Sequence, residues 1–274
     1  MLTRSARPTR RLPRAAGTVA ATLLALSACS SSSGSDTAAA SADGSSSPRL
    51  SGTVTVFAAA SLEESFTALG EKFEKTHPGT EVAFNFAGSD SLAASITGGA
   101  PADVFAAASP KTMAIVTDAR DNATAPVVFA RNRLAIATLP GNPDKITSLE
   151  DLTRSGLKVV LCDKSVPCGA ATQKALDAAG LKLTPVSYEQ DVKGALTKVE
   201  LKEADAAVVY KTDVHAAGAK VEGVDFPESA DAVNDYPIAL LKDAPNTEAA
   251  KAFIDLVRSA EGRQALSEAG FLQP

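Results

Sequence analysis

The chain has 274 residues, enough for two domains of ordinary size, and carries 27 basic against 32 acidic side chains. Residues 1–28 hold five arginines and no acid, so without them the basic count falls from 27 to 22 and the net charge reaches −10. This acidic balance argues against nucleic acid as a partner, because nucleic-acid binding depends on basic side chains that neutralise phosphates. It also means that local dipoles, and not bulk charge, must hold any anion that the protein binds.

The N-terminal segment has the pattern of a secretory signal peptide. Its arginines precede an apolar run over residues 15–26, which is too short for a permanent membrane-spanning helix. The run ends in Leu26-Ser27-Ala28-Cys29, which resembles a lipobox, the motif at which bacterial export machinery lipidates a cysteine. We therefore predict a lipoprotein signal peptide over residues 1–28 and lipidation of Cys29. A chance cysteine behind a plain signal peptide is the alternative.

The segment behind Cys29 has the composition of a linker. Residues 30–48 are almost wholly Ser, Ala, Gly, Thr and Asp, so they cannot bury enough apolar surface to offset their ordering entropy. We predict a flexible tether over residues 29–50. Acyl chains on Cys29 would then anchor an exported body to the outer face of the cytoplasmic membrane.

Residues 54–73 predict a buried strand that runs directly into a helix. Val54-Thr55-Val56-Phe57 favours a strand, and apolar residues then recur from Leu62 at spacings of four, three and four, on one face of a helix. Ser61 stands at the turn behind three alanines, and Glu64 follows at the spacing of a capping box. Because a helix start presents unpaired N–H groups, this turn is a candidate anion site. An ordinary capped helix is the alternative.

A second strand and turn repeat this arrangement. Residues 81–86 alternate as a strand, and Ser89 follows behind Gly88 at the start of a short helix. A serine N-cap is again the plain interpretation, but two such serines after successive strands favour a shared site. Asp103, just before the next strand, is interpreted as a structural carboxylate that hydrogen-bonds a turn.

Short apolar strands alternate with helices through the rest of the chain, which predicts an α/β architecture with largely parallel sheets. We place the first crossing into a second lobe near Phe129, and the return in the strand over residues 236–241. The predicted domains are therefore residues 51–128 plus 236–274 for the first lobe and residues 129–235 for the second.

Two cysteines frame a third turn between a strand and a helix. Cys162 ends a predicted strand, and Cys168 lies in Val166-Pro167-Cys168-Gly169, where backbone N–H groups face the end of the strand. In an exported protein such a pair favours a disulfide over a metal site or a redox nucleophile.

Two further candidate site residues also lie at the start of a helix or at the end of a strand. Val192 starts a helix behind Asp191, and Tyr210 ends a buried strand where its hydroxyl can enter a cleft. A half-buried tyrosine with a water partner is the alternative for Tyr210.

Residue types exclude several kinds of chemistry. The two histidines, His77 and His215, are not in a zinc-like spacing, and the sequence has no Walker loop, dinucleotide-binding glycine pattern or Gly-x-Ser-x-Gly elbow. A Ser–His–Asp arrangement using Ser61 is disfavoured because both histidines stand in surface-type contexts.

Six segments taken together resemble a known family: residues 57–62, 86–89, 99–105, 166–169, 191–196 and 208–210. In this order, over roughly residues 52–273, the chain is similar to the ModA-type molybdate-binding proteins of bacterial ABC importers. The resemblance implies a type II periplasmic-binding-protein fold, with two α/β lobes joined by two crossing strands and a cleft that closes on a tetrahedral oxyanion.

In that family, hydroxyls and backbone N–H groups hold the anion without Arg or Lys. The matching groups here are the hydroxyls and amides of Ser61 and Ser89, the amides of Cys168 and Val192, and the hydroxyl of Tyr210. These five residues are the predicted oxyanion site.

The resemblance further implies a binding protein and not an enzyme. It would need no cofactor, capture molybdate or tungstate as a monomer, and deliver the oxyanion to a membrane permease driven by a separate ATPase. A binding protein for sulfate or phosphate is the alternative within the same fold. A lipid-anchored hydrolase that uses Ser61 is the alternative of a different class.

Overall fold

The structure, a computed structural model, describes residues 49–274. The expected signal peptide, the lipidation site Cys29 and nearly all of the expected tether lie outside this range. Within the described part of the chain, none of the helices combines the length and apolar character that a membrane crossing needs.

The first of two five-stranded sheets draws on both ends of the described chain. Its strands lie in the order β2-β1-β3-β10-β4. Strand β1 pairs in parallel with β2 and β3, whereas β10 runs antiparallel to β3 and β4. The strands are β1 (Gly52–Ala59), β2 (Thr80–Ala87), β3 (Val104–Ala106), β4 (Val127–Asn132) and β10 (Asn234–Leu240).

The second sheet comes from the middle of the chain and has the order β7-β6-β8-β5-β9. Strand β6 is parallel to β7 and β8, and β5 is antiparallel to β8 and β9. Its strands are β5 (Leu134–Thr138), β6 (Val159–Cys162), β7 (Ser187–Glu189), β8 (Ala206–Tyr210) and β9 (Glu222–Val224).

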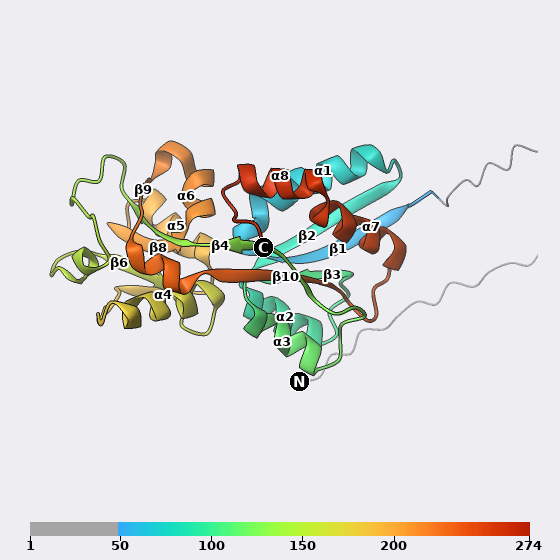
Figure 1. Cartoon of the computed structure of the whole chain (residues 1–274), viewed down its shortest axis with the longest axis horizontal. Coiled ribbons are helices and arrows are strands. Elements are labelled where there is room, and N and C mark those ends of the chain that lie inside the picture. The colour runs from blue at the N-terminus through green and yellow to red at the C-terminus, as the bar shows by residue number, and fades with distance from the viewer. Residues whose placement is uncertain (1–48) are drawn as a thin grey trace, which may run out of the picture. The chain divides into compact units, whose positions relative to one another are not determined.

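Helices cover both sheets and form, with each sheet, one α/β lobe (Figure 1). The first lobe carries α1 (Glu63–Thr76), α2 (Ser89–Thr97), α3 (Pro110–Asp118), α7 (Thr247–Arg258) and α8 (Ala260–Glu268). The second carries α4 (Pro167–Ala178), α5 (Val192–Glu200) and α6 (Lys211–Ala217). Short 3-10 turns lie at Ala60–Leu62, Glu150–Thr153, Gly218–Lys220 and Pro227–Ala232.

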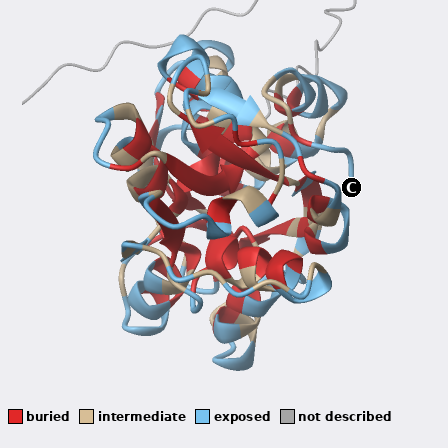
Figure 2. Cartoon of the chain, turned by 90° about the vertical axis from the view of Figure 1, so that its left-hand side faces the viewer, coloured by how far each residue is buried: buried red, intermediate tan, exposed pale blue. Residues whose placement is uncertain are grey.

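Apolar side chains fill three clusters, two in the first lobe and one in the second. In the first lobe Val54 and Val56 join the cluster that includes Phe66 and Phe253, whereas Phe57 joins a separate cluster with Leu92 and Met113. This follows from strand geometry, since neighbouring side chains point to opposite faces of the sheet. Figure 2 shows the result, with buried residues concentrated in the strands and on the inward sides of the helices.

Two strands, β4 and β10, connect the lobes (Figure 1). The first sheet retains β4 through Asn132, beyond the crossing expected near Phe129, because Asn132 still pairs with Asn234 at the start of β10. The sheets are also more mixed than the largely parallel sheets that we predicted. The physical reason in the first lobe is direction: β1 ends toward the second lobe, whereas β10 enters from it and so runs antiparallel to β3.

A disulfide joins Cys162 at the end of β6 to Cys168 in the first turn of α4. Both residues are buried. The adjacent Gly169 allows a close approach of helix and loop, because a Cβ atom there would lie 1.9 Å from the backbone oxygen of Asp163. The disulfide and this glycine therefore fix the start of α4 against the end of β6.

Reduction of this disulfide should lower the free energy of unfolding by about 2 kcal/mol, because the bond removes loop-closure entropy from the unfolded chain. Urea denaturation with and without reductant measures the difference. A Cys162→Ala/Cys168→Ala variant, which should not respond to reductant, is the control. Equal stability of the oxidised and reduced proteins would contradict the prediction.

Candidate functional site

A small cavity lies where the two lobes meet. Its volume is about 20 Å3, so it suits one compact guest. All five predicted site residues line this cavity and all five are buried. The lining residues are Ala59, Ala60, Ser61, Ala87, Gly88, Ser89, Ala108, Val166, Pro167, Cys168, Asp191, Val192 and Tyr210.

Three helices begin at this cavity. Ser89 opens α2 in the first lobe, and Cys168 and Val192 lie in the first turns of α4 and α5 in the second. The first N–H groups of a helix have no partner within that helix, and they carry the positive end of its dipole. Helix starts from both lobes therefore converge on one point, which is the arrangement that favours a bound anion.

Ser61 has a different role from the capping residue that we expected. The structure inserts a 3-10 turn at Ala60–Leu62, so α1 begins at Glu63 and its N-cap is Leu62, with no side-chain cap. The prediction of a capping box is therefore wrong. Instead, the Ser61 hydroxyl lies 2.8 Å from the hydroxyl of Tyr236 on β10, which ties the first lobe to a crossing strand.

Ser89 also differs from an ordinary N-cap. Gly88 holds the N-cap position and Ser89 is the first residue of α2. The Ser89 Oγ accepts a hydrogen bond of 3.0 Å from the backbone N–H of Ala108. Because this N–H occupies one lone pair, the hydroxyl hydrogen of Ser89 is available to a guest in the cavity.

Tyr210 is completely buried, so the alternative of a half-buried tyrosine with a water partner is wrong. Its hydroxyl oxygen accepts a hydrogen bond of 2.7 Å from the side-chain amide of Asn234. Burial raises the pKa of Tyr210 well above the usual value for a phenol, and burial also raises the pKa of Tyr236. Both phenols therefore keep their hydrogens and can donate them.

Charged side chains next to the cavity hold the lobes together. Lys193 of α5 hydrogen-bonds Glu64 of α1, and its Nζ lies 3.6 Å from the buried Asp213 of α6. Within residues 49–274, the pair of Lys193 with Glu64 is the one salt bridge that joins the two lobes.

Burial raises the pKa of Asp213 to about 7, because it disfavours the charged carboxylate. Burial alone would lower the pKa of Lys193, but the carboxylates of Asp213 and Glu64 outweigh it and raise that pKa. Lys193 therefore stays charged and its charge is engaged by carboxylates.

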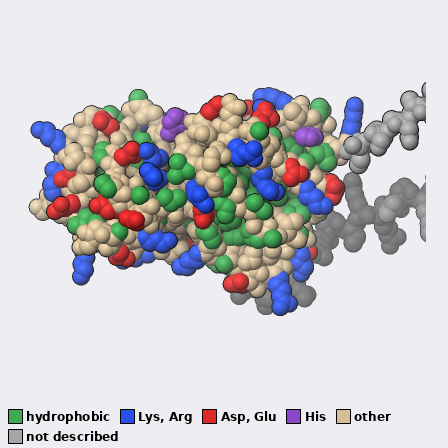
Figure 3. Space-filling view, viewed as in Figure 1, with side chains coloured by type: hydrophobic (Ala, Val, Ile, Leu, Met, Phe, Trp, Pro, Cys, Tyr) green, Lys and Arg blue, Asp and Glu red, His purple; other side chains and the backbone are tan. Residues whose placement is uncertain are grey.

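The cavity lining contains no Lys or Arg. On the face drawn in Figure 3, basic and acidic side chains are interspersed and no basic cluster stands out. The described residues also contain no group of three or more His, Cys, Asp or Glu that could hold a metal ion. The donors that face the cavity are therefore hydroxyls and backbone N–H groups.

Comparison with known proteins agrees with this geometry. Residues 54–272 match the family model of the bacterial extracellular solute-binding proteins. The chain is 45% identical over 259 residues to the molybdate-binding protein ModA of Mycobacterium tuberculosis. The aligned residues cover 94% of this chain and 97% of that protein. The chain belongs to this family of solute-binding proteins.

Two further relatives extend the comparison. ModA of Escherichia coli is 32% identical, over 80% of this chain and 89% of that protein. The solved periplasmic molybdate-binding protein of Azotobacter vinelandii superimposes with a TM-score of 0.70 over 81% of this chain and 99% of that one. At 20% identity this last likeness shows the fold alone, and it confirms the predicted two-lobed periplasmic-binding-protein fold.

Membership of the solute-binding family shows whether this protein is a binding protein or an enzyme. Its members are extracytoplasmic binding components of ABC importers, so the chain is a binding protein and not a hydrolase. The hydrogen bond of Ser61 agrees with this, since its hydroxyl pairs with a tyrosine hydroxyl and not with a histidine.

Sequence reasoning missed three residues beside the site: Asn132, Asn234 and Tyr236. All three are buried on the two crossing strands. Asn234 donates to the Tyr210 hydroxyl, and Asn132 donates to the hydroxyl of Tyr236, which pairs with the Ser61 hydroxyl. Asn132 and Asn234 stand opposite one another where the strands leave the first sheet. The local signal that could have found them is an asparagine at the end of β4 and another at the start of β10.

Gly88 marks a close contact between the lobes beside the cavity. A Cβ atom there would lie 2.6 Å from the backbone oxygen of Gln190, which belongs to the second lobe. That contact exists only when the lobes are together, so a side chain at this position should oppose closure. Within the first lobe the added Cβ would lie 2.8 Å from Oδ1 of Asp90, the end of a flexible side chain that can move aside.

Gly88→Ala should therefore weaken oxyanion binding about tenfold, while the melting temperature of the ligand-free protein changes little. Calorimetry with molybdate and thermal unfolding measure the two quantities. Gly98→Ala, at the other end of α2, is the matched control, because its Cβ would meet only carbonyl oxygens of the same helix. Unchanged affinity of the Gly88 variant would show that closure does not need this contact.

Proposed function

We propose that this protein captures molybdate in the cavity between its lobes. The observation that carries the proposal is the set of neutral donors that converge there from both lobes, with no basic side chain in the lining. Ser61 and Ser89 contribute from the first lobe, and Cys168, Val192 and Tyr210 from the second. Relatives named molybdate-binding protein support molybdate as the guest.

The strength of such a site follows from its donors. A hydrogen bond to a charged group contributes about 1.5–3 kcal/mol, so five or six of them give a Kd between micromolar and nanomolar after the cost of association. The dipoles of α2, α4 and α5 add to the attraction, since the negative guest lies at their positive ends. A cationic side chain is therefore not required.

Donor geometry also separates candidate anions. Hydrogen phosphate carries an O–H group that needs an acceptor, whereas the oxygens of Ser89 and Tyr210 already accept hydrogen bonds from the protein. The side-chain acceptor left in the lining is the Asp191 carboxylate, which caps the start of α5 through the Gly194 N–H. A fully deprotonated tetrahedral dianion needs only donors. Molybdate, tungstate and sulfate meet this condition, so the size of the cavity has to distinguish sulfate from the two larger ions. Tungstate, with the same shape and charge as molybdate, should bind as well.

The rest of the chain fits a role in import. The signal peptide and Cys29 would place the protein on the outer face of the cytoplasmic membrane as a lipid-anchored monomer. Hinge closure about β4 and β10 would enclose the oxyanion, and the closed form would deliver it to an ABC permease with its ATPase. No resident cofactor takes part in this cycle.

Calorimetry of the purified protein tests the proposed ligand. Molybdate and tungstate should bind with micromolar or tighter Kd, and sulfate at least about a hundredfold more weakly. Sulfate binding as tight as molybdate, or no binding of molybdate, would reject the proposal.

Ser61→Ala and Ser89→Ala should each weaken molybdate binding about tenfold, because each removes one donor. Ser95→Ala is the matched control, since Ser95 is exposed on α2 and bonds only within its own helix. The assignment of the two serines fails if their variants bind molybdate as tightly as the control.

A further inference from the structure

The side-chain amides of Asn132 and Asn234 form a polar pair between the crossing strands and the site hydroxyls. The two residues stand opposite one another in the antiparallel register of β4 and β10, and both are buried. Buried amides need hydrogen-bond acceptors nearby. For Asn234 these are Tyr210 and Pro167 of the cavity lining, and for Asn132 they are Thr212 and Tyr236, the partner of Ser61.

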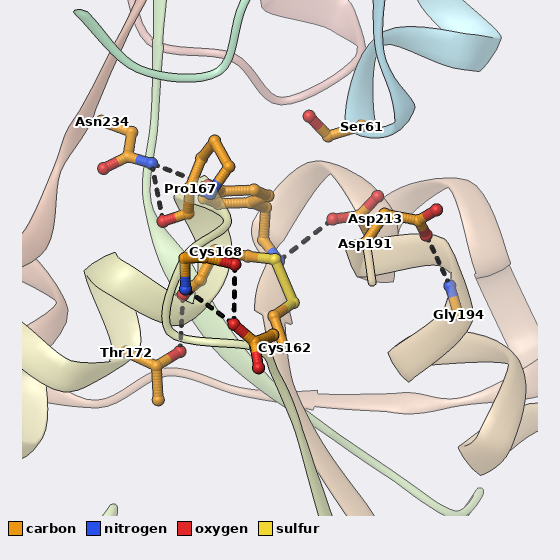
Figure 4. The surroundings of a disulfide bond; sticks show 12 residues. Ser61, Cys162, Pro167, Cys168, Thr172, Asp191, Gly194, Asp213 and Asn234 are labelled. Atoms are coloured by element: carbon orange, nitrogen blue, oxygen red, sulfur yellow. Dashed lines mark hydrogen bonds between the residues drawn. A yellow bond between two sulfur atoms is a disulfide. The ribbon is translucent and has the colours of Figure 1, made fainter. Parts of the chain in front are cut away.

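Asn234 points its amide at the second lobe. Its Nδ2 donates to the hydroxyl oxygen of Tyr210 at 2.7 Å and to the backbone oxygen of Pro167 at 3.3 Å. Figure 4 shows the bond to Pro167, next to the disulfide and Cys168. A carbonyl oxygen can only accept, so the NH2 group of Asn234, and not its oxygen, faces this side.

The same reasoning fixes the amide of Asn132. Its Oδ1 accepts a hydrogen bond of 2.9 Å from the backbone N–H of Arg133, so its NH2 group faces the other way. That group donates to the Thr212 hydroxyl at 2.8 Å and to the Tyr236 hydroxyl at 3.3 Å. The Tyr236 hydroxyl in turn lies 2.8 Å from Ser61.

We propose that Asn132 and Asn234 are positioning residues that set the direction of the hydrogen bonds in the oxyanion site. This inference rests on the proposed function. Because Asn234 donates to Tyr210, the phenol hydrogen of Tyr210 turns to the guest. Because Asn132 donates to Tyr236, Tyr236 gives its own hydrogen to Ser61, and Ser61 gives its hydrogen to the guest. Each of these two series of hydrogen bonds therefore ends in a hydroxyl that donates to the guest.

Asn132 and Asn234 lie on the crossing strands, so the directions of the hydrogen bonds in the site are linked to the hinge. Asn132 bonds Thr212 of the second lobe and Tyr236 of the first sheet, and Tyr236 reaches Ser61 beside α1. This series of hydrogen bonds thus runs from one lobe to the other through the crossing strands. It is assembled in the arrangement of lobes seen here, in which residues of both lobes line the cavity.

The substitution Asn132→Asp tests the proposal, because it should reverse the series of hydrogen bonds that runs from Asn132 through Tyr236 to Ser61. In Asn132→Asp the carboxylate can only accept, so Tyr236 would donate to it and Ser61 would donate to Tyr236, leaving a lone pair toward the anion. Molybdate affinity of the full-length protein should fall about tenfold or more. Asn85→Asp, exposed on β2, adds the same charge away from the site and is the matched control.

A double-mutant cycle separates positioning from a general effect of charge or structure. The added charge acts equally with and without the Tyr236 hydroxyl, so it cancels when Asn132→Asp is compared in the wild type and in Tyr236→Phe. If Asn132 acts through Tyr236, the substitution should cost about tenfold more affinity in the wild type than in the Tyr236→Phe background. Equal losses in both backgrounds would overturn the proposal.

A second cycle keeps the test valid should Asn132→Asp fail to fold. Tyr236→Phe retains the edge contacts of the ring with Phe129 and Phe271. In this background Ser61→Ala should cost less than the tenfold expected in the wild type, because Ser61 is no longer oriented. Additive losses would contradict the proposal. Failure of the wild type to bind molybdate would instead reject the proposed function, so the two outcomes are distinguishable.

Discussion

The proposed function imposes one electrostatic constraint: a doubly charged guest would have to leave water for a small cavity that has no cationic side chain in its lining. Loss of hydration is costly for an ion, and the protein can compensate for it only with donors that are already aligned. Helix starts and hydroxyls meet this need, because their dipoles are fixed before the guest arrives. Neutral donors also suit a protein whose described body is acidic and cannot attract anions by net charge.

The α/β lobes provide these donors by their topology. In each lobe, parallel strands end at the cleft, and the turns that lead into α2, α4 and α5 present N–H groups to the same space. Small residues keep the turns open, as Ala59 and Ala60 do beside Ser61. The disulfide at Cys168 and the side-chain cap of Asp191 on the Gly194 N–H fix the starts of α4 and α5 (Figure 4). The pair of Lys193 with Glu64 then joins the lobes outside the cavity lining.

Much of this could be predicted from the sequence, because strand ends, small turns and helix starts are local patterns. Ser61, Ser89, Cys168, Val192 and Tyr210 were placed together on that basis and on the family resemblance, and they do line one cavity. The capping box predicted for Ser61 was wrong, and the N-cap given as the plain alternative for Ser89 does not hold. Ser61 bonds Tyr236, which is 175 residues away, and Ser89 accepts from Ala108 on another strand connection, so neither serves as an N-cap.

Contacts of this kind leave no trace in periodicity or spacing. Asn132 lies 104 residues from Tyr236, and Asn234 reaches Pro167 across 67 residues. Only the pairing of β4 with β10 brings these side chains to the site. The crossing strands were predicted as connections, but their polar residues gain a role only once the register is known.

The most direct measurement is the position of the metal centre in crystals grown with molybdate, from the anomalous scattering of molybdenum. The account predicts one strong peak in the cavity, with the oxyanion within hydrogen-bond distance of Ser61, Ser89 and Tyr210 and of backbone N–H groups at Cys168 and Val192. A peak elsewhere, or an oxyanion held mainly by lysine or arginine side chains, would contradict it.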